Sequence, residues 1–349
     1  MRSVRTHAST ALGPTAVTVS RAALAGLVLL FAVARLFGTT VSLRTQAAVY
    51  LVGMVALNLP HGGYEHVANL RRRATRFRGR YVAAYLLLAG AFVGLFLVAP
   101  VLGLALAITV AVLKGGGGDL YVLRATTGTG HLRTRAQRLL AVVARGGAVM
   151  AVPIVAFPAT FRTFSSLMVA MVDPGGLAGV AGYFDVTRPL IGGLYGGAVL
   201  AHLGLGFRRR PGTGAWAADA AETLLLVTYF AVVPVVVAVG LYFPCWYSAR
   251  QVARELAVDE TVGDAPDLFG GRDAGTGTIA LRAWSVLIVG ALATAAVAAA
   301  FWVVVPNPLP EPPLLGAVAF WSVFISVVAL PHVVVGSVLD RTRGIWHVP

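Results

Sequence analysis

Cysteine and lysine are almost missing from this chain of 349 residues, since Cys245 and Lys114 are the single examples of each. One cysteine excludes an intrachain disulfide and a cluster of thiolate metal ligands. Charge is also scarce: charged residues make up 12% of the chain, and 14 acidic residues stand against 28 basic ones. With 58% apolar residues and a mean hydropathy of +0.80, the composition excludes an ordinary soluble domain.

Long apolar runs recur along the whole sequence and lack the alternation that marks barrel strands. About 30 Å of hydrocarbon requires roughly 20 helical residues, and lipid offers the backbone no hydrogen-bond partner. We therefore expect an all-α, polytopic integral membrane bundle of about eight or nine helices, folded as one multispan domain in the cell membrane. The predicted spans lie near 19–38, 46–60, 81–99, 101–114, 139–158, 189–207, 222–246, 282–305 and 315–337.

The net charge of +14 comes from arginines in short loops beside apolar runs. This placement follows the positive-inside pattern and does not indicate nucleic-acid binding. It predicts that the basic loops within 71–80, 133–138 and 208–210 are cytoplasmic and that the acidic loop 247–281 lies outside. Arg341 and Arg343 would then also lie outside, so either one short span is miscounted or these charges do not decide the topology. The basic start precedes an apolar run without a clear cleavage site, which predicts an uncleaved first helix.

Ionisable groups at membrane depth are costly and so draw attention to the segment LPHGGYEH. If a helix continues or restarts after Pro60, His61 and Glu65 share one face at four-residue spacing. An imidazole and a carboxylate so placed could bind iron or another divalent ion, and an interfacial turn is the alternative. His332, in a second Leu-Pro-His, is either a third metal ligand or a helix–helix hydrogen-bonding residue.

Two other places carry candidate chemistry. Lys114 ends the fourth predicted span before GGGGD and either snorkels to the interface or forms a Schiff base with an aldehyde, with Asp119 or Glu65 as counter-ion. The run LYFPCWYSARQ places Tyr242, Phe243 and Trp246 where they could form an interfacial belt or line a tunnel for a polyene. We expect His131 to be solvated in a loop and His202 to pack with a hydrogen bond inside a span.

Four blocks of the sequence resemble, in this order, the Brp/Blh family of microbial β-carotene 15,15′-dioxygenases: LPHGGYEH, KGGGGD, YFPCWYSARQ and LPHVVV. The resemblance covers most of the chain. It implies a multispan membrane protein of carotenoid and retinal metabolism that cleaves β-carotene centrally into two retinals, with non-haem Fe(II) held by histidines. His61 matches the first block of that family, which reads like Pro-His-Gly-Ala-Leu-Asp, and Pro331 and His332 match the last.

The other two blocks depart from the family pattern where it has histidines. Alignment on Asp119 places Lys114 at a histidine position, and Tyr247 and Gln251 take the two histidine positions of a run that ends His-Ser-x-Arg-His. Ser248 and Arg250 remain. The resemblance therefore implies that three metal-ligand positions are substituted.

Three hypotheses follow. The first is a non-catalytic relative, a pseudoenzyme, that binds or passes on carotenoid or retinal in the bilayer without a metal. The second is an active dioxygenase with a rearranged iron centre made by His61, Glu65 and His332. The third is a small-solute transporter, which would require paired broken helices in two related halves.

Overall fold

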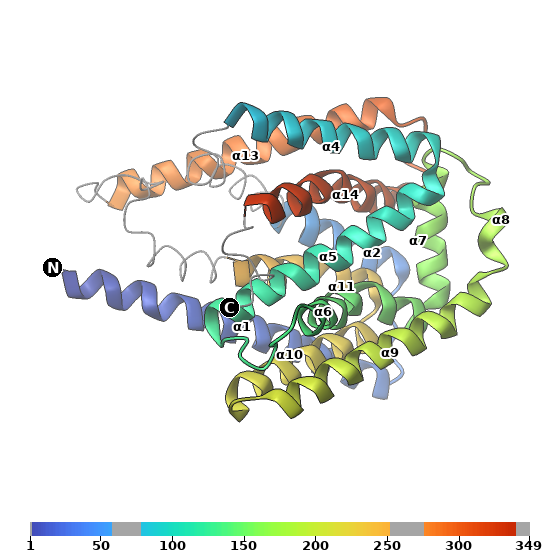
Figure 1. Cartoon of the computed structure of the whole chain (residues 1–349). Helices are drawn as coiled ribbons and strands as arrows, with labels where there is room; N and C mark the ends of the chain where they lie inside the picture. The colour runs from blue at the N-terminus through green and yellow to red at the C-terminus, as the bar shows by residue number, and fades with distance from the viewer. Residues whose placement is uncertain (1, 58–77, 252–275, 340–349) are drawn as a thin grey trace.

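The structure, a computed structural model, describes residues 2–57, 78–251 and 276–339, and every regular element in these ranges is helical. This confirms the all-α prediction. Figure 1 shows most of the long helices lying roughly parallel in one bundle. The elements are α1 (Arg2–Leu36), α2 (Leu43–Leu51), η1 (Val52–Leu57), α4 (Arg78–Val98), α5 (Pro100–Thr126), α6 (Arg135–Ala156), α7 (Pro158–Ala170), α8 (Ala178–Ala181), α9 (Phe184–Arg209), α10 (Thr213–Val232), α11 (Val235–Tyr242), η3 (Phe243–Ser248), α13 (Thr276–Val304) and α14 (Pro313–Leu339).

Seven helices in the described part of the chain are long and apolar enough to cross a membrane. They are Thr15–Leu36, Gly79–Val98, Pro100–Thr126, Arg135–Ala156, Phe184–Arg209, Thr213–Val232 and Pro313–Val335. Two shorter apolar helices, Leu43–Leu57 and Ile288–Val304, accompany them. Large apolar side chains such as Leu87, Leu200 and Val303 are more than 70% exposed on the outer helices, as a lipid-facing surface requires. The protein is therefore a multi-pass membrane protein.

Two predicted spans have different bounds in the structure. The fourth, predicted to end at residue 114, continues through the four glycines to Thr126, because packing against α6 holds this glycine-rich stretch helical. The seventh, predicted as one span over 222–246, is divided into α10 and α11. The reason is Pro234, which has no backbone N–H to continue the helix and instead precedes the first residue of α11.

The division at Pro234 makes α10 and α11 with η3 an antiparallel hairpin. The Tyr229 hydroxyl donates to the carbonyl of Ala238 near the turn (2.9 Å), while Glu222 pairs with Arg250 farther away (2.8 Å). The chain therefore leaves η3 at the same end of the bundle as the basic 208–210 loop, where α13 begins and α14 ends (Figure 1). The prediction that the loop after η3 starts at the end of the bundle opposite the 208–210 loop is wrong. The reason is that α11 with η3 was not counted as a separate, short traverse of the bundle.

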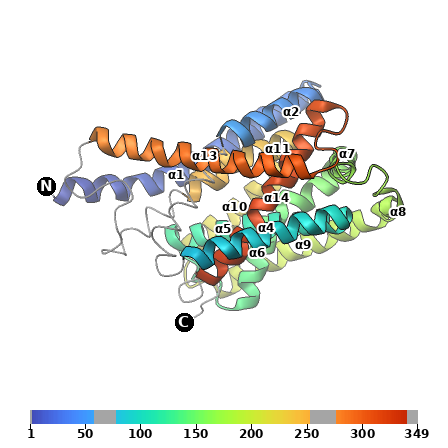
Figure 2. The ribbon, with the colours of Figure 1, turned by 90° about the horizontal axis from the view of Figure 1, so that it is seen from above.

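Glycines bring α5 and α6 into close contact near the middle of the bundle. A Cβ on Gly116 would lie 2.0 Å from the carbonyl oxygen of Val142, and one on Gly146 would lie 1.9 Å from that of Val112. Small residues at such positions let membrane helices approach backbone to backbone. Figure 2, which views the bundle from above, also places α6 beside α5. The glycine run is therefore a helix-packing surface.

Replacing Gly116 with alanine is expected to lower the stability of the bundle by about 1–3 kcal/mol, because the added methyl forces α5 and α6 apart. Gly117→Ala is the matched control: no atom lies within 4 Å of its added Cβ, and alanine favours a helix over glycine by up to about 1 kcal/mol. The measurement is the thermal unfolding midpoint of each variant in the same detergent. Equal midpoints for the two variants would contradict the packing explanation.

Candidate functional site

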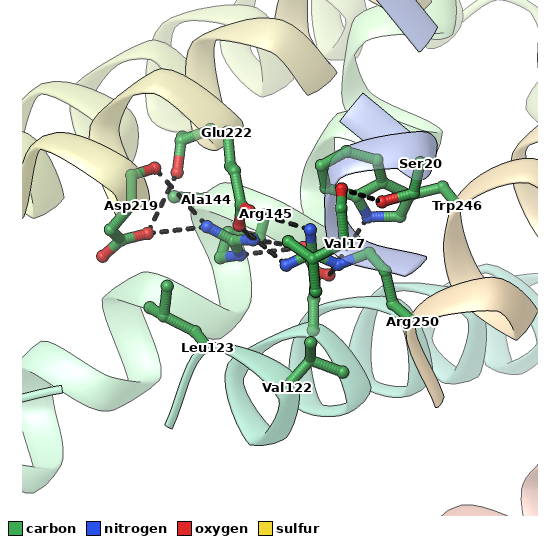
Figure 3. A network of polar contacts seen from close by, with 12 residues as sticks. Val17, Ser20, Val122, Leu123, Ala144, Arg145, Asp219, Glu222, Trp246 and Arg250 are labelled. Carbon is green, nitrogen blue, oxygen red and sulfur yellow. Dashed lines mark hydrogen bonds and ion pairs between the residues drawn. The ribbon is translucent and has the colours of Figure 1, made fainter. Parts of the chain in front are cut away.

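A buried network of charged side chains lies between α5, α6, α10 and η3, centred on Arg145 of α6 (Figure 3). The Arg145 guanidinium is fully buried and contacts three carboxylates. Its Nε donates to Asp119 of α5 (2.9 Å), Nη1 donates to Asp219 of α10 (2.7 Å), and Nη2 donates to Glu222 of α10. One side chain therefore ties three helices together.

Arg250, which follows η3, contacts two of the same carboxylates from the other side. Its Nη1 and Nη2 donate to the two oxygens of Glu222, each at 2.8 Å. This bidentate arrangement is a strong hydrogen-bonding geometry between a guanidinium and a carboxylate. The Arg250 guanidinium lies 4.2 Å from the centre of the Trp246 ring, and Trp246 Nε1 donates to Asp119 (3.0 Å). Arg21 of α1 completes the network by donating to Glu222 (2.8 Å).

Two histidines meet at Asp219. His131 is 1% exposed, with Nε2 2.7 Å from Asp219 Oδ2, and His202 Nε2 lies 3.2 Å from the same oxygen. The prediction that His131 is solvated is wrong: the loop after α5 folds back, and its histidine reaches a carboxylate of α10. His202 is buried as predicted.

The three arginines of the network, Arg21, Arg145 and Arg250, face three carboxylates, those of Asp119, Asp219 and Glu222. Buried ions are tolerated when paired and hydrogen-bonded in this way. Sequence reasoning noted Asp119 and Arg250 but missed Arg145. The signal that could have found it is an arginine in the middle of the apolar run AVVARGGAVMAV.

The three positions at which the resembled family has histidines, Lys114, Tyr247 and Gln251, lie together beside this network. Lys114 Nζ lies 5.7 Å from the centre of the Tyr247 ring. The side chains of Tyr247 and Gln251 both pack against Gly118. A Cβ on this glycine would lie 2.7 Å from Tyr247 Cε2 and 2.8 Å from Gln251 Nε2. Folding thus brings together residues that are more than 130 positions apart in the sequence.

The other predicted metal ligands are divided between described and undescribed parts of the chain. His61 and Glu65 lie outside the described residues. His332 is half-buried near the end of α14, the helix that packs against α5 and α2. Within residues 2–57, 78–251 and 276–339, no three His, Cys, Asp or Glu side chains are arranged to hold a metal ion.

An apolar cavity of about 130 Å³, partly open to the outside, lies between α2, α5, α6, α7, α11 and α14. Its few polar groups are hydroxyls, and those of Tyr50 and Ser322 bond each other (2.7 Å). Phe243 lines the cavity, whereas Tyr242 and Trp246, predicted as lining beside it, belong to a core cluster with α10 and α6.

Lys114 and Tyr247 lie close in sequence to residues that line the cavity. On α5, Ala107 and Ala111 line it, and Lys114 follows three residues later on the same flank. On the facing wall, Val239 and Phe243 line it, and Tyr247 follows four residues later with its ring 5.8 Å from that of Phe243. The lysine and the tyrosine thus lie about one helical turn beyond lining residues and do not line the cavity themselves.

These residues do not fit the histidine-held iron centre that the resemblance implies. Lys114, Tyr247 and Gln251 offer an ammonium, a phenol and an amide, none of which is an imidazole, and Lys114 Nζ lies 5.7 Å from the centre of the Tyr247 ring. A divalent cation at this position would meet a like charge instead of neutral nitrogen ligands.

Comparison with known proteins gives one consistent result. The family described as beta-carotene 15,15′-dioxygenase matches residues 52–340. The "Probable beta-carotene 15,15′-dioxygenase Brp" of Halobacterium salinarum strain R1 is 56% identical over 344 residues, which cover 97% of this chain and 96% of the relative. The "Probable beta-carotene 15,15′-dioxygenase Blh" of strain NRC-1 is 36% identical over 88% of each chain. No solved structure matches. The chain belongs to the Brp/Blh family of β-carotene 15,15′-dioxygenases.

Proposed function

We propose that this protein binds β-carotene, or retinal formed from it, within the membrane as a family member without the family's histidine-held iron centre. The observation that carries the proposal is the apolar cavity, which lies inside a helical bundle and is lined by Ala111 and Phe243, about one helical turn before Lys114 and Tyr247. Its walls offer mainly hydrocarbon and aromatic surface, the kind of surface that suits a polyene. The relatives act on β-carotene according to their names, which gives the ligand class.

The charged network supports this proposal by holding α5 and η3 in place. Asp119 follows Gly118 directly, and Arg250 directly precedes Gln251. Because Arg250 and Trp246 both bond Asp119, α5 and η3 are fixed at the level at which Tyr247 lies over Gly118. The network thus fixes the position of Tyr247 relative to Gly118 and leaves the cavity walls apolar.

The test is pigment binding by the purified full-length protein in detergent, combined with metal analysis and a β-carotene to retinal assay on the same preparation. We expect bound β-carotene or retinal in near-stoichiometric amount, little iron and no retinal formation. A folded protein that binds neither pigment would overturn the proposal.

An iron-dependent dioxygenase is the second candidate, because α14, which carries His332, packs against α2, and η1 directly after α2 ends four residues before His61 in the sequence. His61, Glu65 and His332 would supply two imidazoles and a carboxylate, a set that suits Fe(II), which activates dioxygen when bound. Near-stoichiometric iron together with retinal formation that is lost in His61→Ala would establish this candidate and exclude the metal-free one.

A further inference from the structure

Lys114 is the only lysine of the chain, and it follows the cavity-lining Ala111 by three residues on α5. Its backbone is therefore about 4.5 Å along the helix axis from that of Ala111. The side chain is partly buried and stands over the ring of Tyr247.

The surroundings of this amine favour the chemistry of an aldehyde. Lysines used to form imines are held in pockets that limit their contact with water. Ala111 and Phe243 present apolar surface one turn away on either wall, and the Tyr247 ring can stabilise a positive charge above it. A protonated imine carries the same charge as the ammonium, so the ring stabilises the adduct as well as the free lysine.

We propose that Lys114 is a covalent binding site for a retinoid aldehyde, which it holds as an imine with the polyene tail in the apolar cavity. This inference rests on the proposed function. In the reaction, the neutral amine of Lys114 attacks the aldehyde carbon, a C–N bond forms, and the carbonyl oxygen leaves as water after taking up two protons from the nitrogen. The step is reversible and requires no oxidant or reductant. The reaction that supplies the ligand is oxidative cleavage of a polyene double bond, which yields aldehydes.

Asp119 is not the counter-charge for this imine. Its two carboxylate oxygens contact Arg145, Trp246 and Arg250, and its position five residues along α5 places it on another face of the helix. The Tyr247 ring, 5.7 Å from the amine, can stabilise the positive charge of the imine.

The experiment adds all-trans-retinal to the purified full-length protein in detergent, treats the mixture with sodium borohydride, and locates the stable secondary amine by peptide mass spectrometry. Because Lys114 is the only lysine, a modified lysine identifies the site without ambiguity. The matched variant is Lys114→Arg, which keeps the positive charge but cannot form the imine. Bound retinal is measured separately, before reduction, from quenching of tryptophan fluorescence.

We expect a reduced retinyl adduct on Lys114 in most molecules, no lysine adduct in Lys114→Arg, and a red-shifted absorption band that only the unsubstituted protein shows. Retinal that quenches fluorescence but gives no adduct, or gives one on the terminal amine alone, would overturn the covalent site and leave the proposed function intact. Absence of both quenching and adduct, in a protein that also fails to bind β-carotene, would overturn both.

Discussion

Arg145→Met is expected to destabilise the protein by about 3–5 kcal/mol, or to prevent its recovery as a monodisperse species in detergent. Methionine fills a similar volume but removes the cation that contacts Asp119, Asp219 and Glu222. Buried carboxylates that lose their partner carry the full cost of desolvation. The measurement is the thermal unfolding midpoint, or the recovered monodisperse fraction where no midpoint can be obtained.

The matched control is Arg162→Met. Arg162 is half-exposed and lies 3.5 Å from the exposed Asp185, so its loss should change stability by less than about 1 kcal/mol. A second variant, Arg145→Met with Asp219→Asn, removes one charge of each sign and should recover part of the loss. Equal midpoints for Arg145→Met and Arg162→Met would contradict the structural importance of the network.

Ala111→Phe is expected to lower the bound pigment at least about tenfold, which corresponds to about 1.4 kcal/mol of binding free energy. Ala111 lines the cavity three residues before Lys114, and a phenyl group there would occupy the space of the polyene. The measurement is the pigment-to-protein ratio of the purified protein after incubation with β-carotene or retinal.

Ala105→Phe is the control for this change, because it makes the same substitution on the same helix at an exposed position. Ala105→Phe should bind as much pigment as the unsubstituted protein. If both variants bind equally, the cavity is not the site of the ligand. An unfolding midpoint measured for each variant separates loss of binding from loss of the fold.

The class of fold follows from composition and apolar runs, which depend on local sequence alone. The predicted run near 81–99 corresponds to Gly79–Val98, because a new helix, α5, begins at Pro100. The division at Pro234 was harder to predict, because the residues on both sides are apolar and only the packing of α11 on α2 shows that a short helical segment follows the full-length α10. Local hydropathy cannot distinguish one long span from a hairpin of this kind.

The candidate site could likewise be predicted only in part. The block resemblance placed Lys114, Tyr247 and Gln251 at metal-ligand positions of the family, which stays a prediction, and the structure places Lys114 and Tyr247 near each other and Tyr247 and Gln251 both against Gly118. The contacts of Arg145 and His131 could not be predicted, since their partners on α10 are more than 70 residues away along the chain. Pairing over such distances depends on the order in which helices pack, which a single sequence does not contain.

The distribution of the network's charges along the chain bears on how the protein enters the bilayer during synthesis. Asp119 and Arg145 belong to consecutive helices, so α5 and α6 can enter lipid as a hairpin that is neutral at this pair. The α10 hairpin brings Asp219 and Glu222 together with Arg250, and its remaining negative charge meets Arg21 of the helix made first. Insertion by hairpins therefore exposes fewer uncompensated ions to hydrocarbon than insertion of single helices would.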